Sequence, residues 1–214
     1  MNDSLPMTPE EMASNLVFHV KHEAIEDLTR FYHILAEKNE VMNLVGPATM
    51  PHYWSRHVLD SAQLMNHVPD AKTWADLGAG AGFPGLVLAI LLKHAAGEGG
   101  HVYLIDSLTK RCLFLSEVVK SLDLPATVIN DRAENVKLIV DVVTARAMAP
   151  FPKLFGFAEG FFKRGAEGWF LKGENVDTEL EDAKKAWQFA SNKYSSLSDP
   201  RGRVVHIRSL KHVR

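Results

Sequence analysis

The stretch Trp74-Ala75-Asp76-Leu77-Gly78-Ala79-Gly80-Ala81-Gly82-Phe83-Pro84-Gly85 decides the fold of this chain. It begins as a short apolar run, continues through three alternating glycines and leads into an apolar segment that extends to about Lys93. Glycine lets the backbone turn sharply and lets a ligand approach without a Cβ in the way. The pattern predicts a buried strand, a tight loop and a helix from Phe83 whose amino end meets a ligand at the carboxyl edge of a parallel sheet.

Two acidic residues accompany this loop. Asp76 completes an Asp-x-Gly-x-Gly-x-Gly pattern, which is associated with S-adenosylmethionine because a carboxylate attracts a sulfonium or ammonium group and repels a pyrophosphate. Asp106 follows the apolar run 102–105, at a spacing suited to binding the two hydroxyls of a ribose. The alternatives are a loop carboxylate that hydrogen-bonds local amides for Asp76 and an ordinary strand-end residue for Asp106.

Composition bounds the class of protein. The chain has 214 residues, of which 46% are hydrophobic and 23% charged, enough for a full core without disulfides, and its one cysteine, Cys112, fits a reducing compartment. Its net charge of −2 rules out an argument from overall basicity. No apolar run is long enough to suggest a membrane span, no signal peptide is indicated, and the histidines lack metal-ligand spacing. We expect a cytoplasmic monomer that binds neither membrane nor metal.

The order of expected elements predicts a doubly wound α/β sheet with an N-terminal helical cap. Residues 1–70 form the cap, with a helix starting at Thr8-Pro9 and helical spacing over 25–35 and 53–64. Residues 71–214 form a Rossmann-like domain that ends in an antiparallel hairpin. Its expected strands are 73–77, 102–105, 126–129, 141–144, 168–171, 194–197 and 203–207, and its expected helices are 83–93, 108–122, 152–162 and 177–190.

Six separated motifs make the resemblance specific. They are Asn43-Leu44, Arg56-His57-Val58-Leu59-Asp60-Ser61, the glycine stretch 76–85, Asp106-Ser107-Leu108-Thr109-Lys110-Arg111, Arg146-Ala147-Met148-Ala149 and Leu171-Lys172-Gly173. Over residues 25–210 the chain resembles the RsmG (GidB) family, which usually has Phe where Met148 stands. The resemblance implies a class I methyltransferase fold and transfer of a methyl group from S-adenosylmethionine to N7 of one guanine, guanine 527 in the family, in 16S ribosomal RNA.

The resemblance implies cofactor contacts by Gly78, Phe83, Ala133, Glu134 and Arg146. Gly78 would admit the methionine portion, Phe83 would form an apolar wall, and Ala133 and Glu134 would read the adenine. Arg146 is a positioning candidate because a charge ends an apolar strand there, whereas a surface ion pair is the alternative. Core packing for Phe83 and a helix-start acid for Glu134 are the corresponding alternatives. The full candidate cofactor set is Asp76, Gly78, Gly80, Gly82, Phe83, Asp106, Ala133, Glu134 and Arg146.

RNA contact is expected from local basic groups rather than from net charge. The C-terminal tail carries five fixed positive charges and no acid from residue 201 onward, at Arg201, Arg203, Arg208, Lys211 and Arg214. A charge-protected edge strand is the alternative for the tail, and a hydrogen-bonded seam between cap and sheet is the alternative for residues 56–60. The candidate RNA-contacting residues are Arg56, His57, Lys110, Arg111, Lys172, Arg201 and Arg203.

Guanine N7 carries an exposed lone pair, so its methylation needs positioning and electrostatics but no base. Cys112, in the middle of a helical pattern, is poorly placed for the nucleophilic chemistry of cytosine C5 methylation. Arg146-Ala147-Met148-Ala149-Pro150 is not the Asn/Asp-Pro-Pro-aromatic loop of adenine amine methylation. Two other functions remain open here: methylation of a small molecule, and RNA binding without catalysis by a chain that retains the cofactor fold.

Overall fold

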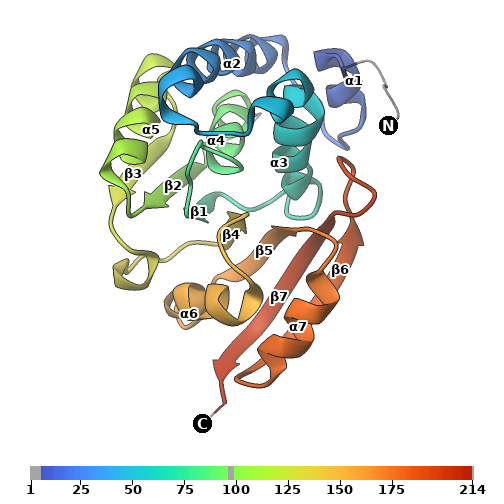
Figure 1. Ribbon diagram of the computed structural model, residues 1–214, viewed down its shortest axis with the longest axis vertical. Helices are drawn as coiled ribbons and strands as arrows, with labels where there is room; N and C mark the ends of the chain where they lie inside the picture. Colours follow the sequence, from blue (N-terminus) through green and yellow to red (C-terminus); the bar gives the residue numbers. More distant parts are fainter. Residues whose placement is uncertain (1–5, 96–98, 214) are drawn as a thin grey trace.

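Seven strands form one mixed sheet at the centre of the computed structural model, which describes residues 6–95 and 99–213 (Figure 1). The strand order is β3-β2-β1-β4-β5-β7-β6, with the first five strands parallel and β7 and β6 antiparallel to their neighbours. This is the predicted doubly wound sheet with a terminal antiparallel hairpin. The strands are β1 (Thr73–Leu77), β2 (His101–Asp106), β3 (Ala126–Asn130), β4 (Val142–Arg146), β5 (Glu167–Lys172), β6 (Trp187–Ser195) and β7 (Arg203–His212).

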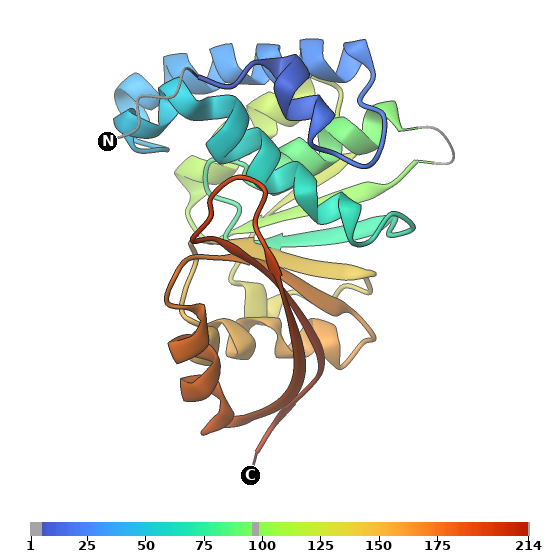
Figure 2. The ribbon, with the colours of Figure 1, turned by 90° about the vertical axis from the view of Figure 1, so that its right-hand side faces the viewer.

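Helices cover both faces of the sheet (Figure 2). Consecutive residues of β1 point to opposite faces, so Trp74 joins the core beneath α1, α2, α4 and α5, whereas Ala75 joins the core above α6 and α7. Both faces being covered explains why the parallel strands are continuous apolar runs. The helices are α1 (Pro9–Ser14), α2 (His22–Met42), α3 (Asp60–Ala62), α4 (Gly85–His94), α5 (Thr109–Ser121), α6 (Phe151–Phe162) and α7 (Val176–Lys184).

The cap forms from local signals that the sequence contains. Thr8 closes a capping box with Glu11 at the start of α1, as its hydroxyl and the adjacent proline predict. The segment expected over 53–64 is helical from Tyr53 to Asn66, with a π-helical part, η2 (Tyr53–Leu59), followed by α3 and the 3-10 turn η3 (Gln63–Asn66). Cap and sheet share one continuous apolar core, and the division at residue 70 stays a prediction.

One predicted helix is wrong at its end. The helix expected over 177–190 stops at Lys184, and residues 187–195 form strand β6, which pairs with β7 along almost its whole length. Trp187 is buried, stands edge-on to Phe155 of α6 and donates its indole N–H to the carbonyl of Pro152. These tertiary contacts and the strand pairing override the helical propensity of the preceding charged turns.

Helix α4 lies so close to the sheet that its first residue has no room for a side chain. A Cβ on Gly85 would lie 2.3 Å from Leu104 Cδ2 and 2.7 Å from Asp76 Oδ2. Because alanine is otherwise favoured in a helix, any loss of stability on Gly85→Ala must come from this overlap.

We therefore expect Gly85→Ala to lower the free energy of unfolding by about 1–3 kcal/mol, the usual cost of overpacking a core. Gly46→Ala is the matched control, because nothing lies within 4 Å of a Cβ built there. Urea unfolding of both variants tests the expectation, and equal stabilities would contradict the close approach.

None of the helices in the described ranges is long and apolar enough to cross a membrane.

Candidate functional site

The glycine loop follows β1 and turns back over the end of β2. Gly78, Gly80 and Gly82 have φ angles of +68°, +55° and +92°, which lie in the left-handed region. The backbone N–H groups of Gly78 and Ala79 both donate to the carbonyl of Ile105, at 2.8 and 3.0 Å. The sequence prediction of a strand, a glycine turn and a helix is confirmed, although the helix begins at Gly85 rather than Phe83.

A cavity of about 310 Å³ opens at the carboxyl ends of β1, β2 and β3. Asp106 is held there by the amides of Gly80 and Leu108, at 3.0 and 2.8 Å, and lies 3.6 Å from the guanidinium of Arg111. The walls combine apolar side chains with two further acids, one of which, Glu134, pairs with Arg132 at 2.8 Å. The lining residues are Gly78, Ile105, Asp106, Ser107, Leu108, Arg111, Asp131, Arg132, Ala133, Glu134, Met148 and Phe157.

This first cavity brings together four of the predicted cofactor residues, Gly78, Asp106, Ala133 and Glu134. Gly80 belongs to the same loop and fixes Asp106 through its backbone. The remaining candidates, Asp76, Gly82, Phe83 and Arg146, lie outside the lining, beneath the loop or on its far side. The first cavity therefore brings together only part of the predicted cofactor set, and cofactor contact by all nine residues stays a prediction.

Asp76 lies beneath the glycine loop and is completely buried. Its Oδ2 accepts from the backbone N–H of Gly85 at 2.8 Å, while Oδ1 has no hydrogen-bond partner among the described residues. Burial is the main cause that raises the pKa of this carboxyl to about 7, with the Gly85 N–H and Arg146 acting in the opposite direction. Asp76 thus holds the amino end of α4 by accepting a hydrogen bond from a nearby backbone amide, which was the alternative to cofactor binding. Direct contact between Asp76 and the cofactor stays a prediction.

The raised pKa of Asp76 has a definite sign for stability. Between about pH 4 and pH 7 the folded protein keeps a proton that the unfolded chain releases, so this group makes folding less favourable as pH rises, and its effect is constant above pH 7. We expect Asp76→Asn to gain stability relative to the parent protein across this interval, by at most about 1.4 kcal/mol per pH unit.

Urea unfolding of both proteins at several pH values measures this difference directly. Titratable groups common to both proteins cancel in the comparison. One of them is His57, whose pKa is lowered by burial, so that its titration makes folding more favourable as pH rises. Parallel stability curves would contradict the assignment of a raised pKa to Asp76.

A second cavity, of about 760 Å³, lies on the other side of the β4 carboxyl end, between the cap and the β6–β7 loop. Its walls contain both basic and acidic side chains and come from four separate parts of the chain. The lining residues are Thr49, Arg56, His57, Asp60, Arg146, Ala147, Met148, Ala149, Pro150, Leu171, Lys172, Gly173, Glu174, Asn175, Glu179, Ser198, Asp199, Arg201 and Gly202.

Arg146 joins the end of β4 to the cap within this second cavity. One guanidinium nitrogen, Nη1, donates to the carbonyl of Arg56 at 2.8 Å and to Asp60 Oδ2 at 3.2 Å. The other, Nη2, donates to His57 Nδ1 at 2.8 Å, and the group lies 5.1 Å from the ring centre of Phe83. Arg146 therefore faces the crevice, as predicted, but it lies beside the cap and not in the first cavity.

His57 has both ring nitrogens occupied. Because Nδ1 accepts from Arg146, the ring proton is on Nε2, 3.0 Å from the hydroxyl of Thr49, which donates in turn to the carbonyl of Gly46. Burial, assisted by Arg146 and Arg56, lowers the pKa of His57 to about 3. The ring stacks on Phe83 at 4.6 Å between centres, so these two candidate residues are buried structural partners.

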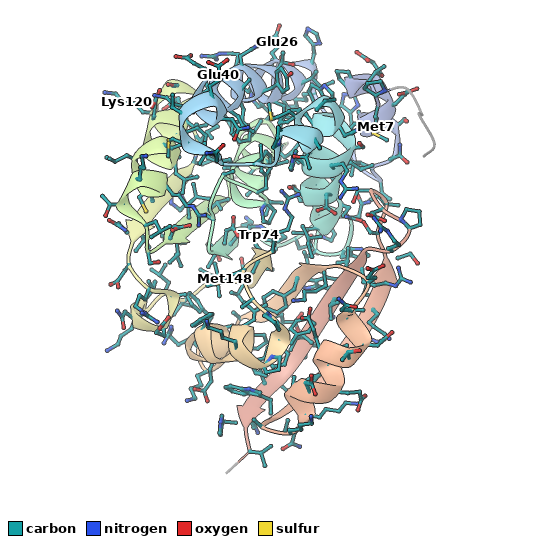
Figure 3. The ribbon with its side chains drawn as sticks, in the orientation of Figure 1. Met7, Glu26, Glu40, Trp74, Lys120 and Met148 are labelled. Atoms are coloured by element: carbon teal, nitrogen blue, oxygen red, sulfur yellow. The ribbon has the colours of Figure 1, made fainter. Side chains whose placement is uncertain are left out.

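Met148 borders both cavities and lies near the middle of the molecule (Figure 3). A Cβ on Gly78 would lie 2.9 Å from Met148 Cγ and 3.3 Å from its sulfur. The contact between the glycine loop and Met148 is thus the partition across which the two cavities approach each other.

The basic candidates divide by position. Arg56, Lys172 and Arg201 line the second cavity with His57, whereas Arg111 lines the first. Lys172 is mostly buried, pairs with Glu179 and donates to the carbonyl of Ala149. Its ammonium group is therefore already bound within the wall of the cavity. The other described basic candidates line neither cavity. Lys110 on α5 and Lys211 on β7 are exposed, and Arg214 lies outside the described residues. Arg203 donates to the carbonyls of Pro200 and Gly202, and Arg208 donates to Asn192.

Sequence reasoning missed the residues that attach the β6–β7 loop to the cap. Gln63 accepts from the N–H of Leu197 at 2.8 Å and donates to Ser196 at 3.0 Å, and Asp60 accepts from Ser198 at 2.6 Å. Asp60 was visible in the motif 56–61, but nothing in the sequence connects it to a residue 138 positions later. Within residues 6–95 and 99–213, no cluster of three potential metal ligands is found.

Comparison with known proteins agrees with the geometry. Residues 24–207 match the profile of GidB, described as rRNA small subunit methyltransferase G. The chain belongs to the GidB family. A relative of that name from Caulobacter vibrioides is 56% identical over the full length of both chains, and one from a Bradyrhizobium species is 43% identical over 88% of this chain and 86% of its own. This GidB protein is therefore a methyltransferase, and S-adenosylmethionine is its cofactor.

Solved structures confirm the class I methyltransferase fold. The SAH-bound methyltransferase PaMTH1 from Podospora anserina superposes with a TM-score of 0.61 over 97% of this chain and 99% of its own, at 10% identity. A point mutant of MtNAS superposes with a TM-score of 0.58 over 91% of this chain and 78% of its own, at 15% identity. At such low identity these similarities establish only the fold of the GidB chain.

Proposed function

We propose that this GidB protein transfers the methyl group of S-adenosylmethionine to N7 of one guanine in 16S ribosomal RNA. The observation that carries the proposal is the pair of cavities that share Met148 as a lining residue. One is small and suited to a cofactor, and the other is wide, open and bordered by arginines. A flipped base needs such a pocket, and its flanking phosphates need such charges.

The first cavity fits the cofactor by the chemistry of its walls. Asp106 uses one lone pair of each oxygen on a backbone amide, which leaves acceptor capacity for ribose hydroxyls. Ala133 and Glu134 provide a small apolar surface and a polar group for an adenine edge, and Gly78 lets the loop backbone approach. When bound, the cofactor supplies an electrophilic methyl group on a positively charged sulfur.

The two titratable side chains that the cap contributes beside Arg146 are already engaged in hydrogen bonds. Both nitrogens of His57 are occupied, and Asp60 is bound by Arg146, Gln63 and Ser198. Burial and Asp106 raise the pKa of the Cys112 thiol, which contacts the carbonyl of Asp106 and lies away from the second cavity. Engaged side chains at this position suit N7, whose lone pair needs no deprotonation, so the contribution of the chain is orientation of the purine.

Transfer of labelled methyl from S-adenosylmethionine to purified small ribosomal subunits, and separately to protein-free 16S rRNA, tests the proposal. Mapping should place the label at N7 of a single guanine. Label on a small molecule in cell extract, with none on RNA, would instead support a metabolite methyltransferase. Cofactor and RNA binding without transfer would support a non-catalytic binding protein.

A further inference from the structure

Asp199 lies between two arginines at the rim of the second cavity. Its Oδ2 is 3.5 Å from Arg56 Nη1 and 3.3 Å from Arg201 Nη2, and its Oδ1 accepts from the backbone N–H of Arg201 at 2.9 Å. These bonds to Arg201 and the charge of Arg56 lower the pKa of Asp199, so the carboxylate is ionised at neutral pH. The arrangement is one anion held by two cations.

The two arginines come from opposite walls of the cavity. Arg56 is in η2 of the cap, and Arg201 is in the loop between β6 and β7. Both loop and cap are fixed to each other by Gln63 and by the Asp60–Ser198 hydrogen bond. The separation of the arginines is therefore set by the fold, whereas their side chains remain about half or more exposed, at 48% and 66%.

The charge balance of this cluster suits replacement of its anion. A phosphodiester, like a carboxylate, carries one negative charge spread over two terminal oxygens, and arginine binds both groups with the same planar fork. Both arginine side chains are about half or more exposed while the Asp199 side chain is 24% exposed, and such partly exposed ion pairs contribute little, so an incoming phosphate displaces the carboxylate at small cost. The two guanidinium groups hold one anion before and after the exchange.

We infer that Arg56 and Arg201 together bind one backbone phosphate of the RNA substrate, and that Asp199 occupies this phosphate site when RNA is absent. The inference rests on the proposed function, because it takes RNA as the ligand of the second cavity. Asp199 keeps both arginines in place and competes with the phosphate. This competition lowers the affinity for any RNA, and an RNA that also places a base in the second cavity compensates for it with that additional contact.

Removal of the competing carboxylate is the direct test. Asp199→Asn keeps an oxygen to accept from the Arg201 N–H and removes the charge, and we expect it to bind protein-free 16S rRNA about two- to fivefold more tightly. Asp182→Asn is the matched control, because Asp182 is on α7, pairs with Lys185 just beyond the helix, lines neither cavity, and its loss changes net charge equally. Filter binding over a series of KCl concentrations gives both affinity and salt dependence.

A second set of variants tests whether the arginines share one phosphate. Arg56→Gln with Arg201→Gln should reduce the slope of log affinity against log salt by about 0.7, the value for one phosphate on a single strand. Each single substitution should produce most of that reduction, because half a clamp holds the phosphate poorly.

Methyl transfer by the parent protein separates the possible failures. If the parent methylates 16S rRNA but Asp199→Asn binds no more tightly than Asp182→Asn, or the two arginine effects simply add, the shared phosphate site is wrong and the proposed function stands. If the parent binds S-adenosylmethionine but neither binds nor methylates 16S rRNA, the proposed function and this inference both fail.

Discussion

Arg146→Ala is expected to reduce methyl transfer to RNA by about 100-fold or more, while affinity for S-adenosylmethionine changes by less than about threefold. Arg146 holds the β4 end to three acceptors of the cap, at Arg56, His57 and Asp60, and it lines the second cavity and not the first. Displacement of a substrate by about 1 Å costs on the order of 100-fold in rate. Loss of this connection is therefore expected to displace the RNA substrate in the second cavity and to leave the cofactor in the first cavity undisturbed.

Arg146→Lys should be almost as defective, because a lysine ammonium lacks the planar fork that reaches three acceptors in fixed directions. Arg164→Lys is the matched control, since Arg164 also donates to backbone carbonyls, those of Leu138 and Val136, but lies outside both cavities. Single-turnover transfer and calorimetric cofactor binding give the two readouts. A loss of cofactor affinity of about tenfold or more in Arg146→Ala would instead favour direct contact with the cofactor.

Gly78→Ala is expected to weaken S-adenosylmethionine binding about tenfold or more. The new methyl group would lie 2.9 Å from Met148 Cγ, and alanine is also strained at a φ of +68°. Because Met148 borders both cavities, its displacement narrows one of them.

The steric part of this loss should be recovered by Gly78→Ala combined with Met148→Ala, whereas the backbone strain of about 1–2 kcal/mol should remain. Met148→Ala alone is the control for the loss of the side chain itself. Cofactor affinity by calorimetry, with thermal denaturation to confirm folding, distinguishes these contributions. Equal defects in Gly78→Ala with and without Met148→Ala would show that strain in the loop, and not contact with Met148, limits binding.

Local patterns in the sequence predicted most of the sheet and several residues that line the first cavity. The strand expected over 73–77 has those limits in the structure, and Gly78, Asp106, Ala133 and Glu134 meet in one cavity. These residues follow the carboxyl ends of parallel strands, which the topology necessarily brings to one edge. The end of α7 was beyond such reasoning, because Trp187 gains its strand conformation from pairing with β7 and packing on α6.

The arrangement of the second cavity depended on the tertiary structure. Arg146 was identifiable as a charge at the end of an apolar strand, but its partners Arg56, Asp60 and His57 lie 86–90 positions earlier. The burial of Asp76 and His57 and the approach of Arg56 to Asp199 likewise arise from packing between segments remote in sequence.

The sequence by itself determined the order of strands and helices along the chain, the glycine loop and the family resemblance, because strand alternation, helix periodicity and glycine φ preferences act within a few residues. The tertiary structure alone decided which charges remote in sequence pair, which titratable groups are dehydrated and which residue borders both cavities. Those properties depend on distances of a few ångströms between side chains from separate elements, and local sequence patterns do not specify such distances.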